Sequence, residues 1–398
     1  MPSKFLSSSI LNVFRDCNSD CGNRNLGKVL KFELPVQFYI DNGVNRSAVY
    51  QALLNIQEKT CIRFKRVFNK IINENGINFL LSSTEYCLNE HVGRRESFYE
   101  PQNIHVDEQC TKNPVEVESY VHQALGALPT HLRNDSTEYI RMRIDNVIYG
   151  RTQYFAPGYY PKIDTFGLQY EFASILHVDA YYFSKNELAD QKTIEVLKFV
   201  KTYDGIIGQR KIATFNDYKY LNFLYCNDTC NNFPYLYCSS PGYRNPNNCF
   251  SCICPSGKEG SSCELLPKTF EQECQTNDIW VTENEEKITF SSQNGYYCAV
   301  RFLTVSNARI FIYFGKFNFT DFEYPCTPSY GIQIKYHKDK GESGLCICLN
   351  STGKEMVLSD DNSLYVIARF NGTPLKIEVY YRRLDYAKAK SLRISHKR

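Results

Sequence analysis

The spacing of apolar and polar residues changes character along the chain and divides it into segments. Residues 36–40 and 77–81 are short apolar runs that favour strands, whereas residues 47–58 carry apolar side chains on one helical face. That face consists of Val49, Ala52, Leu53 and Ile56. The mixture of helix and strand over residues 28–226 predicts an α+β domain.

The clearest helix start lies at residue 113. Asn113 is a good N-cap, Pro114 suits the first helical position, and Glu116 stands at the third. Gly126 stands where such a helix would stop. The apolar stripe of this predicted helix is Val117, Tyr120, Val121, Ala124 and Leu128.

The segments that follow have a different composition. Residues 227–264 hold six cysteines and no apolar run. A segment so small must be stapled by disulfides, because it cannot bury a core of its own. Residues 274–383 alternate Tyr, Phe, Ile and Val with polar residues, which predicts an all-β domain. We expect residues 1–27 to be a separate N-terminal segment and residues 384–398 a solvated basic tail.

Cysteine content indicates the compartment. The chain has 17 cysteines in 398 residues, far above cytosolic usage, so disulfides in an oxidising environment are expected. Asn-x-Ser/Thr sequons favour the same secretory route. They begin at Asn45, Asn134, Asn227, Asn318, Asn350 and Asn371. We therefore expect a secreted, extracellular glycoprotein.

The net charge and the N-terminal residues bear on the expected partners, membrane anchoring and export. A net charge of +3 gives no reason to expect nucleic acid as a partner. No apolar run reaches about 18 residues, so no transmembrane anchor is expected. Residues 1–14 lack a clean apolar segment and an Ala-x-Ala site, so either the start is truncated or mis-assigned, or its export signal is weak.

Several spaced motifs within residues 28–226 occur together in one known family. They are residues 58–64, Cys87 with residues 91–94, residues 103–106 with Cys110, and residues 139–147, 173–177, 207–210 and 221–226. Their order resembles the astacin family of zinc metallopeptidases, in particular nematode astacins that carry an EGF-like and a CUB domain after the protease. The resemblance implies a two-lobed metzincin fold over residues 28–226, a small EGF-like module over 227–264 and a CUB sandwich over 274–383, with a pro-segment remnant in 1–27.

The metal-binding helix of that family is altered here. Metzincins read H-E-x-x-H-x-x-G-x-x-H, in which three His hold zinc and the Glu activates a zinc-bound water. With Gly126 aligned to the Gly of this pattern, the zinc-His positions hold Ser119, Gln123 and Pro129, and the general-base position holds Tyr120. Ser and Gln are poor zinc ligands, Pro has no side-chain donor, and Tyr is a poor base at neutral pH. No catalytic residue and no cofactor is therefore expected.

A shifted alignment gives the alternative. His122 would then be the second ligand, Glu118 would lie one turn before it, and His131 would be the third. The shift puts Leu125 where the turn needs Gly, and it separates His122 from His131 by nine residues instead of six. If that interpretation held, the chain would be an active zinc metalloendopeptidase with non-standard ligands.

The family's Met-turn, Ser-x-Met-His-Tyr, is also changed. Leu176 takes the place of Met and preserves its volume, while Val178 replaces the Tyr that approaches the metal in the family. Residues that shape the fold are retained, whereas residues that would take part in catalysis are replaced. This pattern favours a folded pseudopeptidase.

The resemblance also implies disulfide pairs. In the peptidase and EGF-like parts they are Cys61–Cys226, Cys87–Cys110, Cys230–Cys249, Cys238–Cys252 and Cys254–Cys263, and in the CUB part Cys274–Cys298 and Cys326–Cys348, or Cys346 in place of Cys348. A zinc knuckle is the rival interpretation of Cys249 and Cys252.

Together these observations predict a secreted, non-catalytic binding or regulatory protein. Its partners would be extracellular proteins or peptides, bound through the former active-site cleft and the CUB surface.

Overall fold

A computed structural model of the protein describes residues 29–82, 87–97, 99–157, 164–267, 278–292, 296–317, 325–348, 351–352, 355–370 and 375–385. The expectations for the N-terminal segment, for Cys274, and for the sequons at Asn318, Asn350 and Asn371 lie outside these residues.

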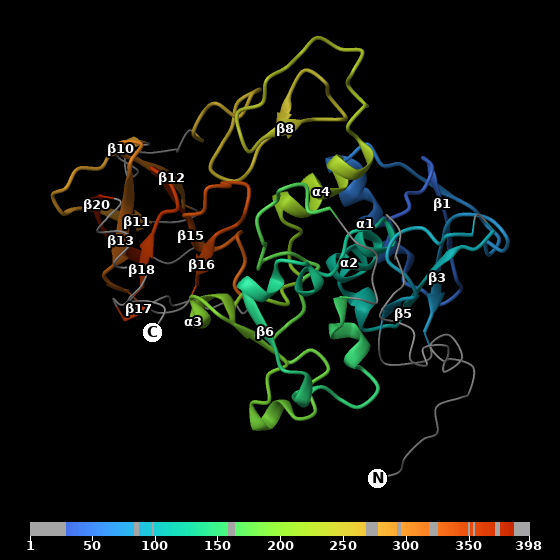
Figure 1. Ribbon diagram of the computed structural model, residues 1–398. Coiled ribbons are helices and arrows are strands. Elements are labelled where there is room, and N and C mark those ends of the chain that lie inside the picture. The colour runs from blue at the N-terminus through green and yellow to red at the C-terminus, as the bar shows by residue number, and fades with distance from the viewer. Residues whose placement is uncertain are drawn as a thin grey trace.

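The N-terminal lobe, meaning the described residues up to Gly126, is a sheet covered by two helices (Figure 1). The strand order is β2-β1-β3-β5-β4, parallel except for the edge strand β4. The elements are β1 (Val36–Ile40), α1 (Arg46–Lys59), β2 (Phe64–Arg66), β3 (Ile77–Leu81), β4 (Leu88–Asn89), β5 (Gln102–Val106), η2 (Cys110–Lys112) and α2 (Pro114–Ala124).

Both helices begin at side-chain caps. Asn45 Oδ1 accepts hydrogen bonds from the amides of Ser47 and Ala48, and Asn113 Oδ1 accepts one from Val115. The helices pack against each other over their apolar faces, which join the sheet in one core. The two strands, the helical face at residues 47–58 and the helix start at Asn113 are confirmed, except that Leu128 lies beyond the end of α2.

The C-terminal lobe, from Ala127 to Cys226, has little regular structure. A strand pair, two helices and short 3₁₀ turns support it, and stacked rings fill its core, with the Phe172 and Tyr203 centroids 3.9 Å apart. The elements are η3 (Thr130–Leu132), η4 (Ser136–Glu138), β6 (Ile140–Met142), η5 (Ile144–Asn146), η6 (Thr152–Phe155), η8 (Glu187–Ala189), β7 (Ile194–Val196), α3 (Val200–Tyr203) and α4 (Phe215–Tyr225).

A small cysteine-rich segment follows, with the hairpin β8 (Tyr243–Arg244) and β9 (Cys252–Ile253). Figure 1 shows it arching between the lobes and the C-terminal domain. Three disulfides hold it, and they are Cys230–Cys249, Cys238–Cys252 and Cys254–Cys263.

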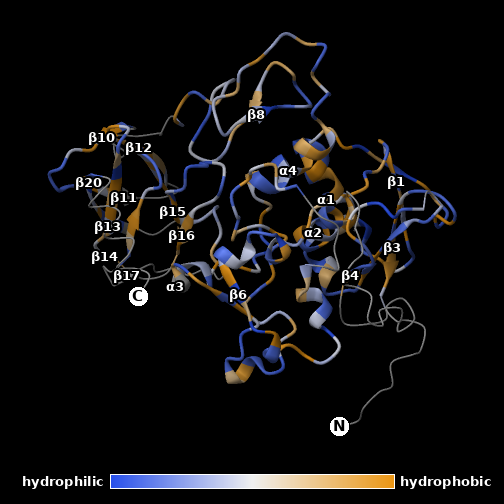
Figure 2. Cartoon of the chain, viewed as in Figure 1, coloured by the Kyte–Doolittle hydropathy of each residue, from blue (hydrophilic) through white to orange (hydrophobic). Residues whose placement is uncertain are grey.

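The C-terminal domain consists of strands in the described residues. Its two main sheets have the orders β10-β12-β19-β15-β16 and β11-β20-β13-β18, and their strands contain hydrophobic and hydrophilic residues (Figure 2). The strands are β10 (Asp278–Trp280), β11 (Glu286–Ser292), β12 (Tyr296–Leu303), β13 (Ala308–Phe314), β14 (Lys316–Phe317), β15 (Gly331–Lys335), β16 (Leu345–Ile347), β17 (Ser351–Thr352), β18 (Met356–Leu358), β19 (Ser363–Phe370) and β20 (Leu375–Asp385). Strand β20 runs to Asp385, and Leu384 is buried. Residues 384 and 385 therefore belong to the sheet and not to the expected tail.

The remaining disulfides join distant parts of the chain. Cys61–Cys226 ties the end of α1 to the end of α4, and Cys87–Cys110 links β4 to η2. In the C-terminal domain Cys326 pairs with Cys348, which leaves Cys346 as a buried free thiol. No helix within the described residues combines the length and apolar character needed to cross a bilayer.

Candidate functional site

Helix α2 carries the positions that the family pattern assigns to zinc, and the chain turns sharply after it. Gly126 has φ +111°, a conformation that favours glycine, and a Cβ at this position would lie 2.5 Å from Val29 Cγ1. A glycine is therefore required where the chain leaves α2 and runs toward Pro129.

Ser119 is buried and its hydroxyl already has a partner. Its Oγ donates a hydrogen bond to the carbonyl oxygen of Glu116, 2.7 Å away, one turn back along the helix. This bond turns the side chain toward its own backbone. Gln123, one turn further on, is only partly buried.

Tyr120 lies beside an ion pair that links α2 to the floor of the C-terminal lobe. Arg210 Nε is 3.2 Å from Glu116 Oε2, and Arg210 Nη1 donates to the carbonyl oxygen of His177 at 3.0 Å. Burial, the main cause, raises the pKa of Tyr120, and the charge of Glu116 adds to the rise. The phenol therefore stays protonated and cannot act as a base at neutral pH.

The turn at residues 174–178, which the sequence aligns with the Met-turn, lies beside the segment that follows α2. Leu176 is buried, its amide donates to Ser174 Oγ at 3.0 Å, and its carbonyl oxygen accepts from the Thr130 amide at 3.2 Å. The segment after Pro129 thus rests on Leu176. Val178 is also buried and presents no polar group.

His122, which the alternative register needs, is fully buried where α2 meets α4. Its Nε2 lies 3.5 Å from Glu118 Oε1, and its ring packs edge-on against Tyr218. Glu118 in turn accepts hydrogen bonds from Asn55 Nδ2 and Tyr218 Oη, each at 2.8 Å. This carboxylate is therefore fixed between α1 and α4.

His131 points elsewhere, into the aromatic core of the C-terminal lobe. Its Nε2 lies 3.0 Å from the carbonyl oxygen of Tyr154, and its ring contacts those of Phe155 and Tyr182. Burial lowers its pKa to about 4, and lowers the pKa of His177 to about 3. Both imidazoles are neutral at physiological pH.

These side chains do not form a metal site. Among the described residues, three ligand atoms converge only at Cys87, Asp107 and Cys110, where the two cysteines are already joined in a disulfide. Neither the aligned positions nor the shifted set of Glu118, His122 and His131 fits a zinc ion.

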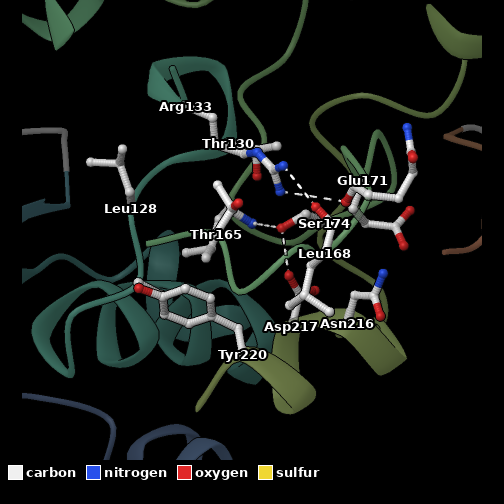
Figure 3. Close-up of a pocket in the computed structure, with 13 residues that line it drawn as sticks. Leu128, Thr130, Arg133, Thr165, Leu168, Glu171, Ser174, Asn216, Asp217 and Tyr220 are labelled. Atoms are coloured by element: carbon white, nitrogen blue, oxygen red, sulfur yellow. Dashed lines mark hydrogen bonds between the residues drawn. The ribbon is translucent and has the colours of Figure 1, made fainter. Parts of the chain in front are cut away.

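A cavity of about 60 Å³ lies beside residues 128–130, against the Met-turn (Figure 3). Asp217 lines it and accepts hydrogen bonds from Ser174 Oγ at 2.5 Å and from the amides of Ile175 and Thr214. Beside it Asn216 is buried, and neither of its side-chain polar atoms is hydrogen-bonded to the described residues. The lining residues are Ala127, Leu128, Thr130, Arg133, Thr165, Leu168, Gln169, Glu171, Ser174, Leu176, Asn216, Asp217 and Tyr220.

Sequence reasoning missed the polar groups that organise this region. Arg210 stands out in the sequence only as part of a motif, yet it connects α2 to the Met-turn. Asp217 had a detectable signal, because it stands three residues after Thr214 in a capping box. Glu171 had none, since only the fold places this carboxyl in the interior.

The sequons that lie in described residues are at Asn45, Asn134 and Asn227, and all three side chains are exposed. Asn45 is also the cap of α1, and its Nδ2 donates to the carbonyl oxygen of Thr111 at 3.0 Å.

Comparison with known proteins shows that residues 28–226 match the family model described as Astacin, a family of peptidases. The zinc metalloproteinase nas-34 of Caenorhabditis elegans is 28% identical over 370 residues, which are 90% of this chain and 57% of that protein. For nas-26 of the same organism the values are 27% over 365 residues, 88% of this chain and 82% of that protein. The zinc metalloproteinase dpy-31 of Brugia malayi is 27% identical over 320 residues, which are 78% of this chain and 51% of that protein. The chain thus spans little more than half of two of these relatives.

Among solved structures, high choriolytic enzyme 1, a hatching enzyme zinc-protease from Oryzias latipes, matches with a TM-score of 0.40 and 22% identity. The match covers 48% of this chain and 88% of that one.

Proposed function

The chain belongs to the astacin family of peptidases, and from this premise we propose that it is a secreted, non-catalytic member that binds other extracellular proteins or peptides. The observation that carries the proposal is the state of α2. Its metal-facing positions hold Ser119, Tyr120 and Gln123, and the Ser119 hydroxyl is already bonded to its own helix.

Retention of the surrounding frame supports a folded binding protein. The Asn113 cap, the Gly126 turn and the packing of Leu176 under residue 130 all remain. Binding of a structural zinc contributes on the order of 10 kcal/mol to the free energy of folding, so a domain without zinc needs other stabilising contacts. The ion pair of Glu116 with Arg210 supplies one such contact across the former site.

The two following parts are proposed to be an EGF-like module over residues 227–264 and a CUB domain over 274–383. The three disulfides of the first, of which two interleave and the third follows them, and the two-sheet arrangement of the second support this assignment. Export and N-glycosylation follow from the disulfide density and the exposed sequons. Treating protein secreted from an animal cell line with an N-glycosidase should lower its mass, and an unglycosylated intracellular product would contradict this part.

Metal content and cleavage test the central proposal. The natural chain should hold no zinc above background and should cleave no peptide in a chelator-sensitive way. The variant Ser119→His/Tyr120→Glu/Gln123→His/Pro129→His should bind about one zinc per chain, because it restores the full ligand pattern on a helix that is followed by the glycine turn. Ser119→His alone is the matched control and should bind none tightly.

Two results would overturn the proposal or its basis. Stoichiometric zinc in the natural chain, with cleavage that a chelator abolishes, would show an active metalloendopeptidase with non-standard ligands. A folded quadruple variant that takes no zinc would show that the helix has been aligned wrongly.

A further inference from the structure

The C-terminal domain is docked on the C-terminal lobe, and one apolar core continues across the boundary. The hydroxyls of Tyr203 in α3 and Tyr336 lie 3.0 Å apart inside this contact. The amide of Cys326 donates to the carbonyl oxygen of Gly205 at 2.7 Å. The two parts therefore share buried polar bonds as well as apolar surface.

Three ionisable side chains lie buried at this boundary. Glu171 comes from the C-terminal lobe, Lys335 from β15 and Glu342 from the loop after β15, and they are 4%, 2% and 1% exposed. The Ser343 amide donates to Glu171 Oε2 at 2.9 Å, which ties the loop to the lobe. Lys335 Nζ donates to the carbonyl oxygen of Lys340 at 2.7 Å, and neither Glu342 oxygen makes a well-formed hydrogen bond to the described residues.

The charges in this cluster do not balance. Two carboxylates and one ammonium would leave a net negative charge in the interior, where like charges repel strongly and unpaired charge is costly. One retained proton makes the cluster neutral. In separated domains both carboxyl groups would lie in water and would release that proton at neutral pH.

Charged groups on neighbouring elements act on the cluster in both directions, some favouring and some opposing retention of the proton. Asp217 of α4 and Asp339 of the loop add negative charge, and Arg369 of β19 adds positive charge. The Cys346 thiol of β16 and the hydroxyls of Tyr203 and Tyr336 also face the cluster and are neutral.

Burial decides the balance at both carboxyl groups. It raises the pKa of Glu171 to about 8, and it raises the pKa of Glu342 well above its usual value. The Gly344 amide favours the charged form of Glu342, but its effect is smaller than that of burial and of the Glu171 charge.

We propose that Glu171, Lys335 and Glu342 form a proton-dependent latch that holds the C-terminal domain on the peptidase domain, with a proton retained between the two carboxyl groups only while the domains are docked. This latch is independent of whether the former active site binds zinc. It makes the position of the C-terminal domain, and access to the surfaces it covers, a function of pH.

The direction of the pH dependence follows from proton uptake. Between about pH 4.5 and about pH 8 the docked state holds a proton that the separated state has lost, so docking weakens as pH rises through this window. Above about pH 8 Lys335 acts in the opposite sense, because burial lowers its pKa to about 8. His131 and His177 disfavour the folded lobe only below about pH 6.5. The range from about pH 6.5 to 8 therefore isolates the latch.

Hydrogen exchange of the full chain tests the latch. After correction for the intrinsic rate, protection of the amides in residues 326–347 should fall by up to about tenfold per pH unit between about pH 6.5 and 8. In Glu171→Gln/Glu342→Gln both carboxyl groups are replaced by amides that imitate the protonated acid, so the fall should shrink to less than about twofold. Glu285→Gln, an exposed position in the same domain, is the matched control and should keep the full dependence.

The natural chain decides the proposal even if the double variant does not fold. Equal corrected protection at both ends of the pH range would overturn it. Each single variant, Glu171→Gln or Glu342→Gln, should reduce the decline in part, because burial still raises the pKa of the carboxyl group that remains. An unchanged decline in a folded Glu→Gln variant of either residue would also overturn it.

Discussion

The N-terminal lobe and the C-terminal lobe stabilise their folds by different means. In the first, a mostly parallel sheet and two capped helices enclose a core of aliphatic side chains with a few phenylalanines, and its buried His122 has a carboxylate beside it. In the second, turns and short helices are held by stacked rings, buried polar bonds and a shared boundary with the C-terminal domain. There His131 and His177 lie buried with no carboxylate bonded to either ring in the described residues.

This difference concerns the two walls of the candidate site. Helix α2 belongs to the N-terminal lobe, where its apolar face and its N-cap hold it. The opposite wall belongs to the C-terminal lobe and depends on tertiary contacts such as that of Arg210 with the His177 carbonyl. Breaking ties within one lobe or between the two should therefore have distinct consequences.

The largest effect is expected from the disulfide that joins the lobes. Replacing Cys61 and Cys226 with Ala should lower the free energy of unfolding by about 5 kcal/mol, because the bond spans 165 residues and restricts the unfolded chain. Removing Cys87–Cys110, which spans 23 residues within one lobe, should cost about 3 kcal/mol. Denaturant unfolding measures both, and equal losses would contradict this ordering.

Acid should weaken the C-terminal lobe first. Burial lowers the pKa of His131 to about 4, so its contribution is present above about pH 6.5 and is lost as pH falls toward 4, by about 3 kcal/mol. His177 extends the loss toward about pH 3. In His131→Phe, the slope of the free energy of unfolding against pH should decrease by the contribution of one proton. An unchanged slope would show that this ring does not titrate as expected.

The turn between the lobes tests whether the shape of the old site is still required. Gly126→Ala should cost about 2 kcal/mol, because φ is +111° and the new methyl group would press against Val29. Gly150→Ala is a suitable control, since φ there is also positive and nothing lies within 4 Å of the added Cβ. Thermal unfolding of both variants separates backbone strain from the steric clash, and a cost at Gly126 no larger than at Gly150 would rule out the clash.

The smallest effect concerns the helix caps. Asn113→Ala should destabilise α2 by about 1 kcal/mol through loss of the bond to the Val115 amide. Thr214→Ala removes the corresponding cap of α4 in the other lobe, where the capping box is buried, and should cost the same or slightly more. If Asn113→Ala had no effect on chemical unfolding, tertiary packing alone would be holding α2.

The prediction from sequence was most complete where the physical cause is local. Strands 36–40 and 77–81 and the face of α1 follow from apolar spacing, and the start of α2 follows from the residues at its cap. The absence of His from positions 119, 123 and 129 is also a property of the sequence alone. Each of these features depends on residues within a few positions of one another.

Only the tertiary structure decided the rest. Whether Glu118, His122 and His131 converge depends on how α2 packs. Packing places His122 against Tyr218 of α4 and His131 among the rings of the C-terminal lobe. The sequence left two partners open for Cys326, and the fold joins it to Cys348.

Long-range packing matters most at the boundary between the domains. Nothing local to Glu171 or Glu342 indicates that they meet, since they are 171 positions apart and come together only where two domains close over them. Side-chain identity determines which chemistry is available, but the packing of the domains determines which groups lose water and therefore hold or release protons.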